Sequence, residues 1–537
     1  MKQLLAGLFL VFSFSALKAQ HTPAAARPVE QTAPGERPAA EVAASFEGLG
    51  ASFSGPQGTA TLRNPSDNAL AVGLNHVVQI VNSRMAIFSK KGSRYDTTGK
   101  VLYGPVETRN VFRGFGGPCE RLNNGDAVVR YDQLADRWLI VMPTFRKLPS
   151  RKYDVDSVTG QRAWPEQPGK AVPLYQPALN ETRQPETGIL HGKDSVYCMC
   201  YAISTTPDPF GPYYRYEFER RLFPDYPRPT VWPDGYYTTS STGDQVIEKH
   251  AYVVDRAQML KGKPATEQSV IVKGVNFMLN ADLDGKRLPP KGTPSIVMAA
   301  GGSQLKQVFE DDGIYVWKFH VDWKDTSKTR LEGPLKIPVA PYHYLCDGQL
   351  TRCVLQPGTE QRLDAQGDKL MTRLTYRIIG KQASIVGVHS VNSAAGSGGV
   401  RWYEFRVDPT QQVSLYQQGT YAPDSNYRWM GSAAMDKNGH IGIGYSYGGA
   451  TQFAGQRFGG RLASDPPGQL TLHEAVLVHG QAAQTNTLRW EDYAQTAIDP
   501  ADDCTFWYVG DYLRKGDTNY STRIGAFRMP GCAVPKK

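Results

Sequence analysis

Short apolar runs separated by polar turns extend along most of this chain. From Phe46 to about Cys532, runs of four to eight apolar or aromatic-rich residues alternate with Gly, Pro, Asn and Asp. Such runs, bounded by turn residues, are typical of β-strands. Helical periodicity is rare, and 255–262 is the short helix candidate. The pattern therefore predicts an all-β protein.

One hairpin pattern recurs three times. In each copy an apolar strand ends in an Asp, a polar turn follows, and an aromatic or β-branched strand comes next. The carboxylates of Asp132, Asp436 and Asp499 can accept hydrogen bonds from turn amides, so we expect them to form turns rather than to catalyse. Repeated units of this kind predict a radial β architecture. The copies occupy residues 128–141, 432–446 and 495–510.

The strands group into seven sets, which predicts a seven-bladed β-propeller with about four strands in each blade. We expect a single propeller domain over residues 46–537. The alternative is a pair of tandem β-sandwiches, which a clear interdomain linker would favour, and the sequence shows none. The sets lie near 68–100, 126–218, 230–290, 294–340, 372–418, 430–477 and 490–530.

The N-terminus has the pattern of a secretory signal peptide over residues 1–19. Lys2 is followed by an apolar stretch and then by the small residue Ala19. Residues 20–45 are rich in Ala, Pro and Glu and have no aromatic residue, so we expect a flexible leader. No other stretch reaches transmembrane length. The protein is therefore predicted to be secreted, periplasmic or on the cell surface.

Seven cysteines in an exported chain indicate disulfide bonds. Cys119 can pair with either Cys198 or Cys200, which leaves one thiol over. The Cys198–Cys200 spacing has no His or Cys cluster nearby, so no metal site is expected there. The other expected bridges are Cys346–Cys353 and Cys504–Cys532.

The net charge of +9 favours an acidic partner, although a solvated basic surface is the other interpretation. No run of five like charges and no nucleic-acid-binding motif is present, so we expect no nucleic-acid partner. No P-loop, Rossmann fingerprint, H-E-x-x-H or G-x-S-x-G motif occurs, and no cofactor is expected. The expected partner is an anionic polysaccharide, bound by a monomer.

The dipeptide Arg-Trp occurs four times, at 137, 401, 428 and 489. Neighbouring strand residues point to opposite faces, so each Trp is expected to fill a layer between sheets while the Arg points elsewhere. In one interpretation each Arg pairs with a carboxylate between the sheets. In the other, Arg401, Arg428 and Arg489 converge at the centre of the propeller and bind a carboxylate or sulfate.

Asp225, Asp492 and Tyr427 are the candidates for proton transfer. Glycoside hydrolysis usually needs two carboxylates, and a lyase needs a base such as Tyr or His with a group that neutralises charge. Asp234 lies in a Pro-Asp-Gly turn signal, and His389 has the sequence context of a buried strand residue.

Six phrases resemble a family of exported bacterial proteins that has no assigned activity, and they are spread along the mature chain between residues 64 and 512. This family is similar in strand pattern to propellers of the sialidase and lyase type, so the resemblance implies a propeller but no reaction. Many members carry a more acidic loop at residues 67–73. Here only Asp67 remains of its carboxylates, and no bound ion is expected. The phrases are NPSDNALAVGLNHVVQIVNSRMAIF (64–88), GFGGPCERLNNGDAVVRYDQLADRWLIV (114–141), YAISTTPDPFGPYYRYEF (201–218), FPDYPRPTVWPDGYY (223–237), GTYAPDSNYRWMGSAAMDKNGHIGIGYS (419–446) and RWEDYAQTAIDPADDCTFWYVGDY (489–512).

Two hypotheses follow for function. The first is a glycoside hydrolase or polysaccharide lyase that acts on an anionic glycan. The second is a non-catalytic module that binds glycan or protein at the same face.

Overall fold

The computed structural model describes residues 29–149, 172–173, 195–220, 223–241, 248–275, 277–302, 309, 312–348 and 351–532. Within these ranges the chain has 33 strands and two short α-helices, α1 (Gly117–Arg121) and α2 (Arg256–Met259). The predicted all-β class is confirmed, and α2 lies where the helix candidate was expected. No helix in the described part is long and apolar enough to cross a bilayer. The predicted signal peptide lies outside the described residues.

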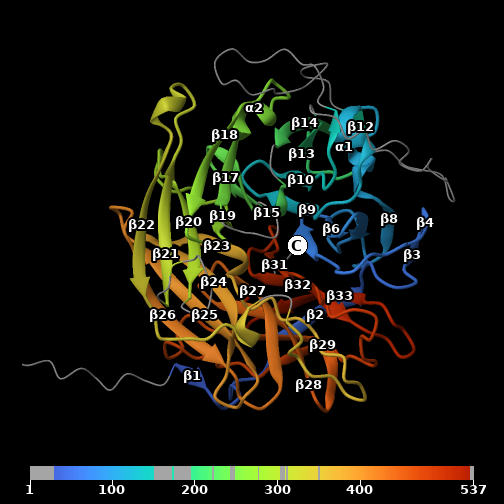
Figure 1. Ribbon diagram of the computed structural model, residues 1–537, viewed down its shortest axis with the longest axis vertical. Coiled ribbons are helices and arrows are strands. Elements are labelled where there is room, and N and C mark those ends of the chain that lie inside the picture. Colours follow the sequence, from blue (N-terminus) through green and yellow to red (C-terminus); the bar gives the residue numbers. More distant parts are fainter. Residues whose placement is uncertain are drawn as a thin grey trace, which may run out of the picture.

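Antiparallel strands that follow one another in the sequence form most of the sheets (Figure 1). One sheet contains β5 (Ala69–Val72), β6 (His76–Val81), β7 (Arg84–Ser89) and β8 (Val101–Glu107). The next contains β9 (Val128–Asp132), β10 (Arg137–Pro143), β13 (Ser195–Ser204) and β14 (Pro212–Arg220), with the short β11 (Leu148–Pro149) and β12 (Val172–Pro173) paired to it. A third contains β15 (Asp225–Trp232), β16 (Gly235–Ser241), β17 (Glu248–Asp255) and β18 (Glu267–Lys273).

The largest sheet joins two such meanders through a parallel pair, β19 with β23. Its first part is β19 (Leu279–Leu283), β20 (Ser295–Gly301), β21 (Gly313–His320) and β22 (Arg330–Pro338). Its second part is β23 (Met371–Ile379), β24 (Gln382–Asn392), β25 (Gly398–Val407) and β26 (Val413–Tyr421), with β1 (Glu30–Gln31) at the outer edge. A further sheet contains β27 (Tyr427–Met435), β28 (Ile441–Gly449), β29 (Gln452–Arg461) and β30 (Ala475–Val478). The last contains β31 (Gln495–Ile498), β32 (Thr505–Tyr512), β33 (Ser521–Arg528) and β2 (Glu41–Glu47), and β3 (Ser54–Gly55) pairs with β4 (Gly58–Thr59).

The first strand of each meander lies at the middle of the molecule (Figure 1). These inner strands neighbour one another in sequence order, and β31 returns to lie beside β5, so they form a closed ring. The ring runs through β5, β9, β15, β19, β23, β27 and β31. All inner strands therefore begin at one end of the axis and finish at the other.

The segment predicted to be a flexible leader, residues 20–45, contains β-strand at residues 30–31 and 41–45. β1 pairs in parallel with β26, and β2 pairs antiparallel with β33 and completes the last four-stranded sheet. An Ala- and Pro-rich segment needs no core of its own when its backbone groups can pair with the open edge of an existing sheet. Hydrogen bonds to the edges of two sheets therefore order this segment, although its composition does not favour a folded structure.

The recurrent Asp residues form turns, as predicted. Asp132, Asp436 and Asp499 each accept a hydrogen bond from the backbone N–H two residues later, at 3.0, 2.8 and 2.9 Å. Each turn joins an inner strand to the second strand of the same sheet. The Asp turns therefore lie at the end of the axis where the inner strands finish.

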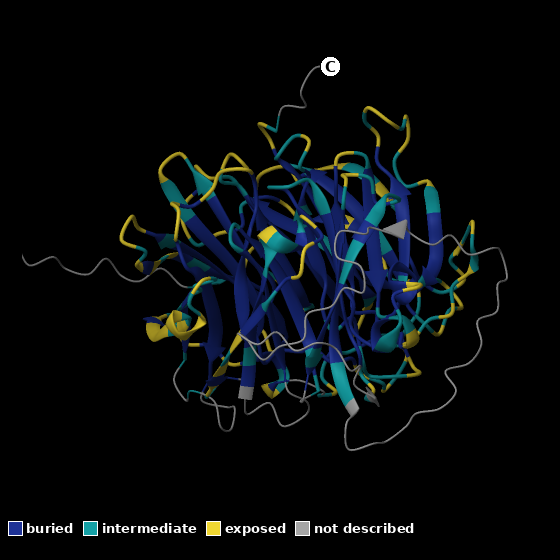
Figure 2. Cartoon of the chain, turned by 90° about the horizontal axis from the view of Figure 1, so that it is seen from above, coloured by how far each residue is buried: buried dark blue, intermediate teal, exposed yellow. Residues whose placement is uncertain are grey.

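Buried residues fill the sheets, and exposed ones concentrate in the loops (Figure 2). Trp138, Trp402, Trp429 and Trp490, the tryptophans of the Arg-Trp pairs, are all buried, as predicted. Aromatic side chains of this size supply much of the contact area between sheets.

The disulfides agree with the sequence analysis. Cys119 pairs with Cys200 rather than Cys198, and Cys198 is buried in the same apolar cluster. The two other expected bridges are confirmed, Cys346–Cys353 and Cys504–Cys532.

Candidate active site at the starts of the inner strands

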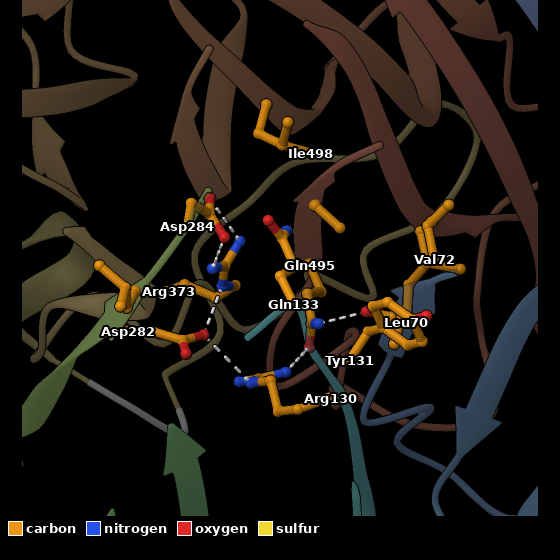
Figure 3. A pocket seen from close by; sticks show the side chains of 13 residues that line it. Leu70, Val72, Arg130, Tyr131, Gln133, Asp282, Asp284, Arg373, Gln495 and Ile498 are labelled. Carbon is orange, nitrogen blue, oxygen red and sulfur yellow. Dashed lines mark hydrogen bonds and ion pairs between the residues drawn. The ribbon is translucent and has the colours of Figure 1, made fainter. Parts of the chain in front are cut away.

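A network of buried ion pairs joins the inner strands at the axis (Figure 3). Arg373 of β23 bonds Asp282 of β19 at 2.6 Å and Asp284 just beyond that strand at 3.1 Å. Arg130 of β9 lies 3.4 Å from Asp282 and also donates to the side chain of Gln495 in β31. The cavity between these residues is about 20 Å³, which holds about one water molecule. This axial network is therefore too tightly filled to bind a sugar.

A second group of charged and aromatic side chains lies where the inner strands begin. Asp67 and Asp126 lie two residues before β5 and β9, and Asp225 opens β15. Arg489, Asp492 and Tyr493 lie within the six residues before β31. A lysine from β17 completes it. We call this group the strand-start cluster, and its members are Asp67, Asp126, Asp225, Tyr226, Arg228, Lys249, Arg489, Asp492 and Tyr493.

Three members of the strand-start cluster are the most accessible. Asp225 is half-buried, and the side chains of Arg489 and Asp492 are 34% and 13% exposed. Arg489 Nε donates to Asp492 Oδ1 at 3.0 Å, and Gln366 Nε2 donates to the same oxygen at 3.3 Å. Burial and the neighbouring charge of Asp492 raise the pKa of Asp225. The structure thus brings together three of the residues that the sequence analysis selected.

Two further carboxyl groups lie deeper. Asp67 is 1% exposed and Asp126 is 8% exposed. Burial, and then the charge of Asp126, raises the pKa of Asp67 well above its ordinary range. Burial, and then the charge of Asp225, raises the pKa of Asp126 to about 7, although Arg228 acts in the opposite direction. The pKa values of Asp67, Asp126 and Asp225 are therefore all raised, an arrangement suited to a general acid.

The backbone of the cluster is unusual at three positions. Asp67, Tyr226 and Asp492 have φ angles of +51°, +51° and +65°. Residues other than glycine seldom adopt this left-handed conformation, and such residues gather at functional sites. At each of these positions the left-handed conformation turns the backbone near the start of an inner strand.

Several buried donors of the cluster have no acceptor in the part of the chain that the structure describes. Arg228 is fully buried, and none of its three guanidinium nitrogens has a hydrogen-bond partner among the described residues. The same is true of the Tyr226 and Tyr493 hydroxyls and of Lys249 Nζ. Burial lowers the pKa of Lys249 to about 7. Buried polar groups almost always find partners, so this concentration of exceptions calls for a functional explanation.

Arg401 and Arg428 do not join Arg489, so the predicted convergence of the three arginines is not what the structure has. The Arg428 guanidinium is buried between Asp424, at 2.9 Å, and Glu474, at 2.8 Å. Arg401 donates to the Ala340 carbonyl at 3.1 Å and to the Thr420 hydroxyl. Both guanidinium groups therefore already have acceptors within the fold.

The remaining candidates lie outside the cluster. Tyr427 is half-buried near Gly398 and makes no polar contact in the described part of the chain. Asp234 lies in the turn between β15 and β16 and accepts from the Tyr237 hydroxyl at 3.1 Å. His389 is buried, and its Nε2 lies 2.9 Å from the Tyr403 hydroxyl. The structure thus agrees with the structural interpretation of Asp234 and His389. Tyr427 opens the inner strand β27 and packs against the apolar cluster that contains Tyr226 and Tyr493.

The sequence analysis did not select Asp126, Arg228 or Lys249 as site residues. A signal existed for the first two, because each lies within four residues of the start of a predicted inner strand, as Asp225 and Asp492 do. Lys249 comes from the third strand of its sheet, and nothing in its local sequence distinguishes it.

No protein-family model matches the chain, and no curated protein matches it. Among solved structures, the chain is similar to a protein of unknown function from Dyadobacter fermentans at 9% identity, covering 92% of this chain and 100% of that one, with a TM-score of 0.34. A subtype N10 neuraminidase-like protein of A/little yellow-shouldered bat matches at 8% identity over 79% and 100%, with a TM-score of 0.33. An exo-β-1,3-galactanase from Clostridium thermocellum matches at 10% identity over 91% and 97%, with a TM-score of 0.28. At these TM-scores the similarities decide neither the details of the fold nor the activity.

Proposed function

We propose that the chain is a seven-bladed β-propeller and that the strand-start cluster is the active site of a glycoside hydrolase that acts on an anionic glycan. The closed ring of inner strands supports the blade count, because each inner strand opens one meander. β2 would supply the outermost strand of the last blade and so join the two ends of the chain. Ligand sites carried on loops at one end of a rigid scaffold are common in β folds.

The observation that carries the proposed reaction is the meeting of buried and accessible carboxyl groups from four different inner-strand starts. Asp126, with its pKa raised to about 7, is suited to give its proton to the glycosidic oxygen as the sugar–oxygen bond breaks. Asp225 or Asp492, nearer the solvent, would act as the second carboxylate and either attack the sugar carbon or activate a water molecule.

Charge supports an anionic substrate. The chain carries a net charge of +9, and Arg489 is partly exposed beside the two accessible carboxylates. The predicted signal peptide would export the protein to the compartment in which it meets extracellular polysaccharides.

The test is hydrolysis of a panel of acidic and neutral oligosaccharides by the wild type, Asp126→Asn and Asp225→Asn. We expect each variant to lose a factor of about 10²–10⁴ in kcat on the substrate that the wild type cleaves. Asp96→Asn is the matched control, because Asp96 is exposed in the turn between β7 and β8, at the opposite end of the axis. Undiminished turnover by both cluster variants would contradict the proposal, and binding without any turnover would favour a binding module.

A polysaccharide lyase is the second candidate, and Lys249 is the observation that favours it. A buried lysine with a pKa of about 7 is partly neutral at neutral pH and could remove a proton next to a sugar carboxylate. A lyase leaves an unsaturated, ultraviolet-absorbing sugar end, whereas a hydrolase leaves a new reducing end only. The absorbance of the products therefore separates the two reactions.

A further inference from the structure

Among the described residues, the strand-start cluster has more buried donors without a hydrogen-bond partner than buried acceptors without one. The Arg228 guanidinium, the Lys249 ammonium and two tyrosine hydroxyls have no partner among the described residues, whereas Asp67 Oδ1 is the one cluster acceptor in that state. Leaving a buried donor unsatisfied costs about 1–3 kcal/mol, and more when it is charged. A ligand that brings oxygen acceptors would remove this cost.

The two cations are linked through aromatic rings. The Arg228 Cζ lies 3.7 Å from the centre of the Tyr226 ring and 3.6 Å from that of Tyr493. The Tyr226 ring contacts Phe277, with 4.9 Å between centroids, and Lys249 Nζ lies 5.3 Å from the Phe277 ring centre. Tyr226 and Tyr493 are nearly perpendicular, at 84°, so Arg228 lies in the corner between them. The rings hold the guanidinium in place, and none of its N–H groups makes a hydrogen bond of normal geometry to a described residue.

From this arrangement we propose that Arg228, with the Tyr226 and Tyr493 hydroxyls and Lys249, binds the carboxylate of an acidic sugar unit. A carboxylate is a small, flat anion with two oxygens that match the forked N–H groups of a guanidinium. It carries one charge, which limits repulsion from the neighbouring Asp126 and Asp225, and it is smaller than a sulfate ester. The three arginines chosen from the sequence for this role, Arg401, Arg428 and Arg489, already have acceptors.

This assignment rests on the proposed function for the presence of a glycan but can fail separately from it. Binding is measured by calorimetry with full-length protein and oligosaccharides of glucuronate, galacturonate and mannuronate. Each acidic probe is paired with its carboxyl-reduced form, and a sulfated neutral oligosaccharide is the third arm. Asp126→Asn is included because it removes the proposed acid while leaving Arg228 in place.

We expect an acidic probe to bind the wild type and Asp126→Asn at least about tenfold more tightly than its carboxyl-reduced form. Arg228→Lys should weaken that binding by about tenfold or more, because a lysine cannot offer the fork. Arg330→Lys, at an exposed position of β22, is the control and should bind as the wild type does. If Arg228→Lys does not fold, Lys249→Gln is compared with the wild type in the same way, and it too should bind the acidic probe more weakly.

The proposal is overturned if no acidic probe binds, if the carboxyl-reduced or the sulfated probe binds as tightly as the acidic one, or if folded Arg228→Lys binds like the wild type. Hydrolysis of a neutral glycan alone would leave the hydrolytic reaction standing, but it would overturn both the anionic substrate and the carboxylate site. Tight binding of an acidic probe without turnover would support the carboxylate site and contradict the proposed hydrolase.

Discussion

Arg373 and Arg228 are both buried arginines of inner strands, but their hydrogen bonding differs. Arg373 bonds two carboxylates, Asp282 and Asp284, which belong to the axial network. Arg228 has aromatic rings beside it and no hydrogen-bond partner among the described residues. Buried charges stabilise a fold only when they are well paired, so the axial network holds the ring together. In the strand-start cluster, the guanidinium of Arg228 has no such partner among the described residues and is available to a ligand.

The largest expected effect is on the axial network. Arg373→Met leaves Asp282 and Asp284 buried without their main partner, and we expect the free energy of unfolding to fall by about 3–5 kcal/mol. Guanidinium-induced unfolding, followed by tryptophan fluorescence, measures it. Arg330→Met, at an exposed position, is the control and should stay within about 0.5 kcal/mol of the wild type.

The same substitution at Arg228 should behave differently. Arg228→Met removes a buried charge from which no carboxylate receives a hydrogen bond in the described part of the chain. The lost contact with two tyrosine rings is offset by the lost desolvation cost, so we expect the free energy of unfolding to change by less than about 1 kcal/mol. A loss as large as that of Arg373→Met would mean that Arg228 is satisfied in the folded protein, and the contrast between the two regions would disappear.

The strand-start cluster should also give stability a characteristic pH dependence. The pKa of Asp126 is raised from an ordinary 3.8 to about 7 in the folded state. Between about pH 4 and pH 7 the folded protein therefore holds a proton that the unfolded chain releases, so this carboxyl favours folding less as the pH rises through that range. Unfolding midpoints across pH 4–8 should fall less steeply with pH in Asp126→Asn than in the wild type. Equal slopes in both proteins would show that Asp126 is ionised when folded.

How much of this could be predicted from the sequence differs between the two regions. Local patterns predicted the strands, the turns at Asp132, Asp436 and Asp499, and the burial of the tryptophans, because strand alternation and turn chemistry act over a few residues. Asp225 and Asp492 were found because their phrases carry aromatic residues near a strand start, and Arg489 was found because it belongs to one of the four Arg-Trp pairs. Which arginines meet depends on how the ring closes, and that information is spread over the whole chain. The edge pairing of β2 has the same origin, because its partner β33 lies at the other end of the sequence.

The smallest expected change in the free energy of unfolding is at the ion pair between Arg37 and Asp465. Arg37 lies 2.9 Å from Asp465, but its side chain is 51% exposed, so water already solvates much of the guanidinium. Asp465 also accepts a hydrogen bond from the Leu462 N–H at 2.7 Å and one from the Thr471 hydroxyl, which remain when Arg37 is replaced. We therefore expect Arg37→Gln to lower the free energy of unfolding by less than about 1 kcal/mol. That loss should shrink further in high salt, as measured by urea unfolding with and without added sodium chloride. A loss comparable with that of Arg373→Met would show that burial does not separate the paired arginines at the axis from those at the surface.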